Sequence, residues 1–490
     1  MKRLFYSVML LAVCSSEAMA GGLVTNSNQS ASFLRNPARD AVIDIDGVYT
    51  NPAGVCFMPN GFHLGLTIQH PEQQRNITTT FPTFALNQNH LGEATHTFKG
   101  KASAPVVPSF QAAYVMDKWT VSASFAITGG GGKCTFNNGI GSLEAVASMM
   151  PVTGLAQMMQ NTADPMLPVY QAVMPVLQKG QYTYNLDAYM RGRQYYFGLQ
   201  VGAGYKVNDN LAVFAGVRSV IGSSTYTGYL KNIRYASIDQ GPTAQYTAAV
   251  INGINAKAGD IEMTTDQSCV GFTPIIGVDY KLNDQWNFAV KYEFRTKMNL
   301  ENSSDMNDMA RAQSALAKFN QDSTAYVRDD IPGTLTLGVQ YSPIETVRLN
   351  AGFHYYDDCN AVKYDNDHKK INGGTREILF GAEWDATKLL TVSAGWQNTH
   401  YDLSDKYMAD MSYNLSSNMI AMGVRLNVSK KVNIDLGYMH NFYSNRKVDT
   451  VVGQKQIVND NGEVVKTDII KTDFYERKND VVAVGVNFKF

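Results

Sequence analysis

The sequence predicts an all-β protein: an antiparallel transmembrane β-barrel of about fourteen strands, with an N-terminal hatch (plug) and partly helical extracellular loops. Three observations predict this fold. The C-terminal residues alternate apolar side chains with small or polar ones and end on an aromatic residue. The same alternation recurs in pairs of segments that short polar turns connect, and long segments separate these pairs. Short turns on one side and long loops on the other are typical of bacterial outer-membrane barrels, with the short side periplasmic.

Residues 1–20 have the layout of a secretory signal peptide. Two basic residues precede the apolar run 4–13, and Ala18-Met19-Ala20 offers a small-residue cleavage site. Cys14 suggests lipoprotein processing as an alternative, but the residue before it is larger than such sites favour. We therefore expect an exported chain that is cleaved before Gly21 and reaches the bacterial outer membrane.

Composition excludes several other classes. No later apolar run reaches the roughly 18 residues that a transmembrane helix needs. The formal net charge is -1 and no basic stripe occurs, so we expect no nucleic-acid partner. The histidines lack metal-ligand spacing, and HExxH and GxSxG motifs do not occur, so we expect no metal, no cofactor and no enzyme. One loop disulfide and free thiols both stay open for the mature cysteines, Cys56, Cys134, Cys269 and Cys359.

The strands are assigned from the C-terminus backwards. In residues 482–490, valine and phenylalanine occupy alternate positions, which predicts a strand with one lipid-facing side. Two hairpins turn at residues 117–118 and 208–210, where polar residues tolerate the required backbone angles. Four further hairpins turn near residues 283–285, 343–346, 386–388 and 429–431. With a lone strand at 62–68 and the terminal strand, the total is about fourteen, an even number as bacterial barrels require.

The long segments between the hairpins are expected on the extracellular side. They are residues 71–108, 129–191, 229–267, 299–330, 358–374, 401–416 and 445–477. Aromatic residues at the predicted strand ends suit interfacial girdles. They include Trp119, Trp286, Trp384, Trp396, Tyr341 and Tyr438. A soluble all-β protein is the alternative, because alternation alone does not say whether lipid or protein covers the apolar face.

Residues 21–60 precede the first strand and are too few for a core of their own, so we expect them inside the barrel that residues 61–490 form. Within this segment, residues 30–38, 41–46 and 49–54 resemble the N-terminal hatch of the FadL-type outer-membrane transport family (FadL/TodX-like). The match includes the Asn-Pro-Ala triplet at residues 51–53. Residues 330–339 and 129–139 resemble, more weakly, the start of a mid-barrel strand and the Gly-rich end of the third strand of that family.

The resemblance implies a passive transporter of hydrophobic compounds, long-chain fatty acids or aromatic hydrocarbons. It also implies a route: capture by apolar outer loops, binding beside the hatch, hatch movement, and lateral exit through a kinked strand. Candidate gating residues are Asn51, Pro52, Ala53 and Gly54. Pro52 would stiffen this turn, and Gly54 would permit backbone geometry that is closed to other residues.

Three further groups of residues fit this route. Candidate capture residues lie in a Met-rich segment with helical spacing, whose alternative role is packing on the rim: Met149, Met150, Leu155, Met158, Met159 and Met174. Candidate cations for a substrate carboxylate face the lumen by strand parity, where an ion-paired wall is the alternative: Arg218, Lys291, Arg295, Arg348 and Arg425. Candidate lateral-exit residues, which also suit a flexible loop, are Gly129, Gly130, Gly131 and Gly132. A second helical loop is expected at residues 309–319.

The expected partners are a hydrophobic small molecule, the lipid bilayer of the outer membrane, and the outer-membrane insertion machinery, which would recognise the strand that ends at Phe490. We expect a monomer. The alternative function is a surface receptor or adhesin whose loops bind host or phage components. An energy-coupled receptor is a third alternative, but its plug would be a domain of roughly a hundred residues, and only residues 21–60 are available here.

Overall fold

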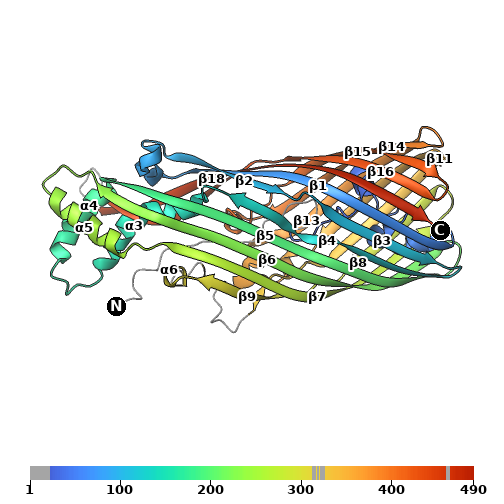
Figure 1. Ribbon diagram of the computed structural model, residues 1–490, viewed down its shortest axis with the longest axis horizontal. Coiled ribbons are helices and arrows are strands. Elements are labelled where there is room, and N and C mark those ends of the chain that lie inside the picture. The colour runs from blue at the N-terminus through green and yellow to red at the C-terminus, as the bar shows by residue number, and fades with distance from the viewer. Residues whose placement is uncertain (1–22, 312–315, 317–318, 320–325, 459–463) are drawn as a thin grey trace.

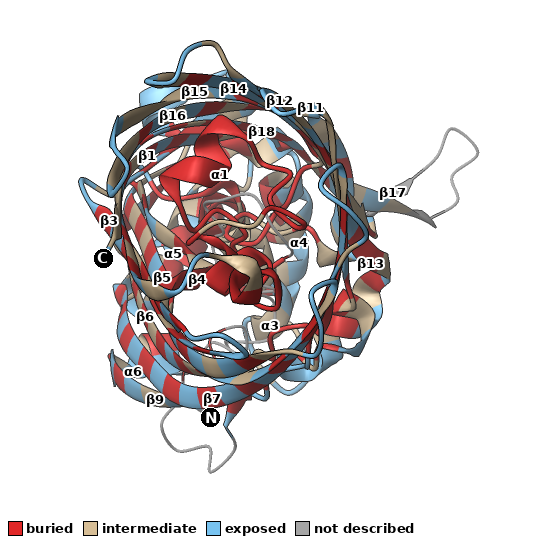
Figure 2. Cartoon of the chain, turned by 90° about the vertical axis from the view of Figure 1, so that its right-hand side faces the viewer, coloured by how far each residue is buried: buried red, intermediate tan, exposed pale blue. Residues whose placement is uncertain are grey.

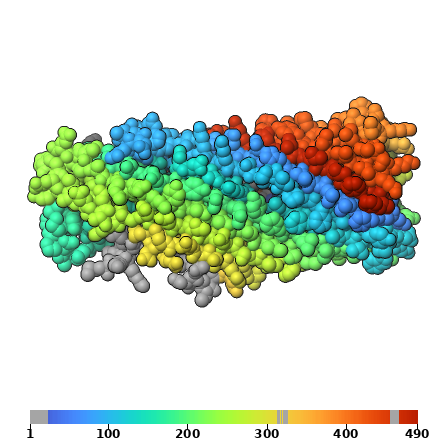
Figure 3. All heavy atoms as spheres, in the orientation of Figure 1, coloured from blue at the N-terminus to red at the C-terminus, as the bar shows by residue number. Residues whose placement is uncertain are grey.

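The computed structural model describes residues 23–311, 316, 319, 326–458 and 464–490. The predicted signal peptide and its cleavage site lie outside this range, as does much of the second helical loop predicted at 309–319. The described sheet has eighteen strands, all paired antiparallel, and it closes on itself where β1 pairs with β18. Figure 3 shows this seam, where the first strand (blue) runs beside the last (red).

Fourteen strands form the wall of the barrel. They are β1 (Gly61–Thr80), β3 (Val107–Val115), β4 (Trp119–Phe136), β5 (Tyr182–Lys206), β6 (Leu211–Ser237), β7 (Ile261–Lys281), β8 (Trp286–Glu293), β11 (Thr334–Ile344), β12 (Val347–Tyr356), β13 (Ile371–Asp385), β14 (Leu390–Leu403), β15 (Ser417–Ser429), β16 (Val432–Tyr443) and β18 (Val464–Lys489).

Four further strands extend the wall strands β3, β8, β11 and β16 toward the extracellular end. They are β2 (Thr95–Ser103), β9 (Asn299–Met306), β10 (Val327–Arg328) and β17 (Arg446–Val458). β2 pairs with β1 and β4 as β3 does, β9 pairs with β7 as β8 does, and β17 pairs with β18 as β16 does. Eighteen strands less these four extensions leave fourteen, so the predicted fold is confirmed.

The strands are longer than the sequence predicts. On β7, every second residue from Val270 to Tyr280 faces outward and is apolar or proline, which marks the lipid-facing band. On the N-terminal side of Val270, toward the extracellular end, the outward positions are Ser268, Asp266 and Thr264, yet the strand continues. Much of the predicted loop sequence at 71–108 and 445–477, and both ends of 129–191, are therefore strand. The prediction stopped early because the outward apolar pattern ends where the strands leave the lipid.

Helices cover the extracellular end. α3 (Gly141–Met158), α4 (Leu167–Gln178) and α5 (Ala244–Lys257) lie together at the end opposite the short turns (Figure 1). The sequence predicts helix in the Met-rich segment, where α3 and α4 form, but it does not predict α5. Among the described residues, no helix is long and apolar enough to cross a membrane. The loop disulfide does not form, because four cysteines in the described residues are free: Cys56, Cys134, Cys269 and Cys359.

Residues 23–60, called the lumen segment below, lie inside the ring of strands (Figure 2). The segment contains α1 (Ala31–Arg35), α2 (Gly47–Thr50) and the short 3₁₀ helix η1 (Gly54–Phe57). Ser30 caps α1 by accepting a hydrogen bond from the backbone N–H of Phe33. Nearly all side chains from Leu23 to Cys56 are buried, because the inward faces of the wall surround them.

A charge placed in the lipid-facing band should destabilise the barrel. Ile276 points outward from the middle of the band on β7, so Ile276→Arg should lower the free energy of unfolding in lipid vesicles by about 2–4 kcal/mol. Thr264→Arg, on the same face of the same strand but beyond the band, is the matched control and should change it by less than about 1 kcal/mol. Equal losses in both variants, measured by denaturant unfolding, would contradict the position of the band.

Candidate functional site

The lumen segment is anchored to the wall by buried ion pairs. Nε of Arg35 lies 2.9 Å from Oδ1 of Asp435, and its Nη1 lies 2.8 Å from Oε1 of Glu383. Arg39 approaches Asp46 of its own segment to 2.7 Å and Glu383 of β13 to 3.2 Å. Removing one partner of such a buried ion pair lowers the stability of the fold by about 3–5 kcal/mol, since the other charge is left buried without a partner. These pairs therefore fix α1 and the turn after it.

Two of the predicted lumen cations belong to the same network. Arg425 lies 2.7 Å from both Asp435 and Asp44, so it ties β15 to β16 and to the lumen segment. Arg348 lies 2.7 Å from Asp385 and 3.1 Å from Glu383. Strand alternation placed both side chains correctly toward the interior. Carboxylates of the wall and of the lumen segment already neutralise their charges.

Arg218 and Lys291 surround Tyr49 of α2. Nη1 of Arg218 lies 2.6 Å from Oε2 of Glu293, and Nζ of Lys291 lies 2.8 Å from Oε1 of the same carboxylate. Lys291 also donates a hydrogen bond to the backbone oxygen of Tyr49 at 2.8 Å. Both cations lie over the Tyr49 ring, at 4.7 and 4.8 Å from its centre. They hold the lumen segment in place, a contact that the sequence does not reveal.

Arg295 does not point into the lumen, so the parity assignment is wrong for this residue. Its side chain is 49% exposed, and Nη1 donates to the backbone oxygen of Asn360 at 2.7 Å. The cause is local: β8 ends at Glu293, and the neighbours Phe294 and Arg295 are both exposed. Alternation is lost where the strand ends, and every position after the break shifts in parity.

The Asn-Pro-Ala-Gly turn lies against β7. Nδ2 of Asn51 donates to Oδ2 of Asp279 at 2.5 Å, while its Oδ1 accepts the backbone N–H of Gly54 at 3.2 Å. A Cβ atom at Gly54 would collide with the Asn51 side chain, so the turn requires glycine there. Ala53 packs on Phe214 and Ile275 of the wall. The four predicted gating residues thus form one compact turn at the wall.

A buried histidine bridge joins the lumen segment to β12 and β13, and sequence reasoning missed it. Nε2 of His354 lies 2.9 Å from Oδ1 of Asp40, and Nδ1 lies 2.8 Å from Oε2 of Glu377. Gln397 and Thr399 of β14 also donate to Glu377. Strand alternation could have placed His354 on the inward face. It could not have identified the partner, because Asp40 is more than 300 positions away in the sequence.

The wall is interrupted between β3 and β4. β4 pairs with β3 through residues 120–125 and with β2 through residues 134–136. Within the described chain, residues 126–133 have no ladder partner on this side. On the other side, pairing with β5 shifts register around Gly129 and Gly132, which marks β-bulges. Gly130 and Gly132 have φ of 88° and 67°, conformations that favour glycine.

The start of the lumen segment occupies this interruption. Thr25 forms an antiparallel bridge with Gly129, the N–H of Asn26 donates to Thr128 O at 2.9 Å, and the N–H of Gly130 donates to Val24 O at 3.2 Å. A Cβ atom at Gly129 would collide with the Val24 carbonyl, so glycine permits this close approach. Residues 24–26 thus supply the backbone partners that β3 does not.

Gln29 spans the interruption. Its Nε2 donates to the backbone oxygen of Ile127 on β4 at 3.0 Å. Its backbone oxygen accepts hydrogen bonds from β3, from Oγ of Ser109 at 2.7 Å and from Nε2 of Gln111 at 3.1 Å. The same residue therefore connects both edges of the gap.

The lumen is closed beside α2. A cavity of about 30 Å³ lies among Tyr49, Lys291, His354 and neighbouring side chains. That volume holds one or two water molecules. A fatty acid or an aromatic hydrocarbon does not fit in a cavity of this volume.

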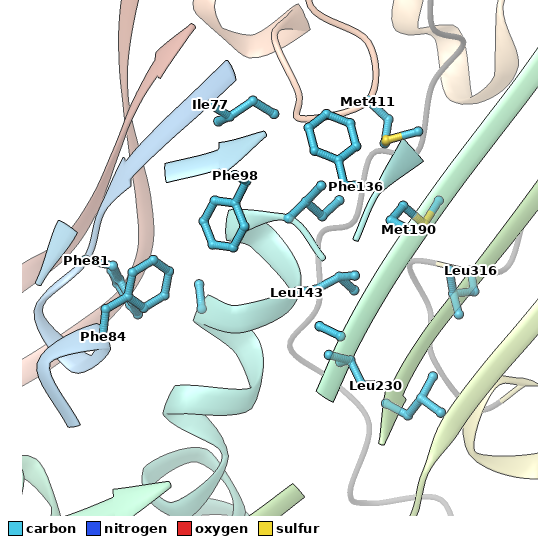
Figure 4. Close-up of a cluster of buried hydrophobic side chains, with 14 of the residues drawn as sticks. Ile77, Phe81, Phe84, Phe98, Phe136, Leu143, Met190, Leu230, Leu316 and Met411 are labelled. Carbon is cyan, nitrogen blue, oxygen red and sulfur yellow. The ribbon is translucent and has the colours of Figure 1, made fainter. Parts of the chain in front are cut away.

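The extracellular part of the barrel has an apolar interior. Figure 4 shows side chains from β1, β2, β4, β5 and the α3 region converging, among them Ile77, Phe98, Phe136, Leu143 and Met190. Of the predicted capture residues, Leu155 is fully buried in this cluster. The methionines at positions 149, 150, 158, 159 and 174 are half-buried and pack against it. The Met-rich helices thus cover the apolar interior at the mouth of the barrel.

Asp358, on the extracellular turn η5 (Asp358–Asn360), holds the first described residues of the lumen segment. Its Oδ2 accepts hydrogen bonds from the N–H and Oγ1 of Thr375 at 2.9 and 2.6 Å, and the carboxylate also accepts the backbone N–H of Leu23. Burial raises the pKa of Asp358 to about 6, although these hydrogen bonds and Lys363 oppose the shift.

A pH effect follows from Asp358. Since its folded pKa of about 6 exceeds the unfolded value of about 3.9, the folded state binds the proton more tightly, and its stability should increase as pH falls from 7 to 4. Asp358→Asn removes this titration. The variant should be about 1–3 kcal/mol more stable than the wild type at pH 8, and the difference should shrink below pH 6. Denaturant unfolding at several pH values measures it, and a difference that does not vary with pH would contradict the assignment.

Comparison with known proteins agrees with this geometry. The family model of the outer membrane protein transport protein family (OMPP1/FadL/TodX) matches residues 194–490. No curated protein matches the sequence. Among solved structures, a FadL homologue of Pseudomonas aeruginosa is 13% identical, with a TM-score of 0.63, over 96% of this chain and 100% of that chain.

Two other similar structures are transporters of toluene. The toluene transporter TodX of P. putida is 14% identical, with a TM-score of 0.51, over 91% of this chain and 94% of its own. The toluene transporter TbuX of Ralstonia pickettii is 12% identical, with a TM-score of 0.53, over 94% and 98%. At these identities the structures establish a shared fold. The family match covers more than half of the sequence, and on that ground the chain belongs to the FadL/TodX family of outer-membrane transport proteins.

Proposed function

We propose that this protein takes up hydrophobic small molecules passively across the outer membrane, through capture at the extracellular mouth and hatch-gated lateral exit. The substrates would be long-chain fatty acids or aromatic hydrocarbons, as the family and the names of the similar transporters suggest. The observation that carries the proposal is the position of residues 24–29, which fill an interruption in the wall between β3 and β4.

Capture would take place at the apolar interior under α3 and α4. Methionine side chains are flexible and polarizable, so they can repack around ligands of different shape. The half-buried residues Met149, Met158 and Met174 lie over a cluster of buried aromatic and aliphatic side chains. Their displacement would expose an apolar surface to a hydrophobic molecule.

The two parts of the lumen segment differ in how strongly they are held, and this difference suggests which part moves. Residues 24–29 are attached mainly by hydrogen bonds, each worth about 0.5–1.5 kcal/mol net. Residues 35–46 are attached by several buried ion pairs, and breaking one costs about 3–5 kcal/mol. We infer that the first part swings away from the interruption while the second part remains docked.

The lumen cations have a structural role in this scheme. Arg218, Lys291, Arg348 and Arg425 each have a carboxylate within 3 Å. A substrate carboxylate would have to displace these partners, so we favour the ion-paired wall over carboxylate capture by these residues. The gate that we propose therefore responds to the apolar part of a substrate.

Loosening the attachment of Gln29 should open the gate more readily. The double variant Ser109→Ala, Gln111→Ala removes both donors to the Gln29 carbonyl and should raise the rate of uptake about 5- to 30-fold, since it removes about 1–2 kcal/mol from the closed state. Uptake of labelled oleic acid and of labelled toluene would be measured in cells that lack other transporters of this family. Saturable binding to the purified protein would be measured in parallel.

Ser224→Ala is the matched control, because the Ser224 hydroxyl is buried in the wall and has no hydrogen-bond partner among the described residues. It should leave uptake unchanged. Unchanged uptake in the double variant would refute the gate. A wild-type protein that binds neither probe would refute hydrophobic transport and favour the receptor interpretation.

A further inference from the structure

Two histidines and a glutamate lie together on the extracellular connection between β1 and β2. His90 ends the 3₁₀ helix η3 (Gln88–His90), Glu93 follows it, and His96 lies on β2. One ligand atom of each residue lies within 4.8 Å of those of the other two. The imidazole centres are 4.7 Å apart. The spacing of the histidines alone does not reveal this cluster, because Glu93 is its third member.

His96 is held as a metal-binding histidine would be. Its side chain is only 9% exposed, and its ring stacks on Phe84 at 4.8 Å. Nδ1 lies 3.1 Å from Oε2 of Glu144, where it can donate a hydrogen bond. Nε2 is buried and has no hydrogen-bond partner among the described residues. A carboxylate on one ring nitrogen fixes the tautomer that leaves a lone pair on the other, as is usual beside metal ions.

Glu144 is itself fixed in position. Its Oε1 accepts hydrogen bonds from Nδ2 of Asn87 at 2.8 Å and from the hydroxyl of Tyr184 at 2.9 Å. The carboxylate lies near the start of α3 and so connects this helix to the β1–β2 connection. Together with Glu93, it gives the cluster two carboxylates, which complement the charge of a divalent cation.

We propose that His90, Glu93 and His96 bind a divalent transition-metal ion, with Zn²⁺ as the best fit. Two imidazoles and one carboxylate suit Zn²⁺, whereas Ca²⁺ and Mg²⁺ prefer sites built from oxygen ligands. The side chains of His90 and Glu93 are 54% and 68% exposed, so they can move inward to bonding distance. All three residues line a surface cavity of about 680 Å³, which leaves room for a fourth ligand on the ion.

The bound ion would clamp the β1–β2 connection at the mouth of the barrel. Through Glu144, it would also be coupled to α3, which covers the apolar interior. The proposal does not depend on the transport function, because it rests on the geometry of this cluster alone.

The test uses the full mature protein in detergent, with any polyhistidine tag removed. Calorimetric titration with ZnCl₂ should show one saturable site per chain, and Co²⁺ should give the visible absorption of a four-coordinate complex. Glu144→Gln should weaken Zn²⁺ binding about 10- to 100-fold while the Co²⁺ spectrum keeps its form, since Glu144 only positions His96. His90→Ala and His96→Ala should weaken binding more than this.

His70→Ala is the matched control, since His70 lies 3.5 Å from Glu72 in another exposed His–Glu pair. It should bind Zn²⁺ like the wild type. His90 is exposed, so its variant should fold normally, and circular dichroism would confirm this. The absence of saturable Zn²⁺ binding in the wild type would overturn the proposal. Unchanged binding in both His90→Ala and His96→Ala would do the same.

Discussion

The pairing of β1 with β18, from His63 opposite Lys489 to Thr80 opposite Thr472, closes the sheet into a ring. In lipid each backbone N–H and C=O needs a partner inside the protein, so only a closed sheet can span the membrane with strands. Closure also divides every strand into a lipid face and a lumen face. The lumen face of this barrel carries many charged and amide side chains, and these must find partners in a space that excludes most water.

The lumen segment supplies those partners, and it does so unevenly. Arg35 and Arg39 meet Glu383 and Asp435 as buried ion pairs, whereas residues 24–29 meet β3 and β4 through hydrogen bonds. An element that is fixed at one end and weakly held at the other can move without leaving the lumen. The weakly held end lies at the place where the wall lacks ladder pairing, so the mobility that we infer coincides with the route that it would open.

The strands continue past the lipid-facing band on the extracellular side, where water replaces lipid around them. Past the lipid band, the outward residues of β7 become polar, and many inward residues of the wall at this end are apolar or aromatic. The barrel thus holds an apolar interior outside the membrane, covered by α3 and α4. Such an interior can receive a hydrophobic molecule from water before that molecule meets the polar lumen. The connection that carries His90, Glu93 and His96 borders the same interior through Phe84.

The sequence by itself determined the ring of about fourteen strands, the short turns and the inward parity of Arg218, Lys291, Arg348 and Arg425, because alternation with period two is a local property that lipid on one face enforces. It also located the Asn51–Gly54 turn through a motif. Only the tertiary structure decided the partners: Asp40 with His354, Arg35 with Glu383, and Gln29 with both β3 and β4. Those pairs join positions far apart in the chain. The sequence prediction was wrong for Arg295, because the end of β8 at Glu293 shifts the inward–outward alternation and no local pattern indicates that shift. Which charges neutralise one another depends on how the strands close around the segment, and no local spacing records that.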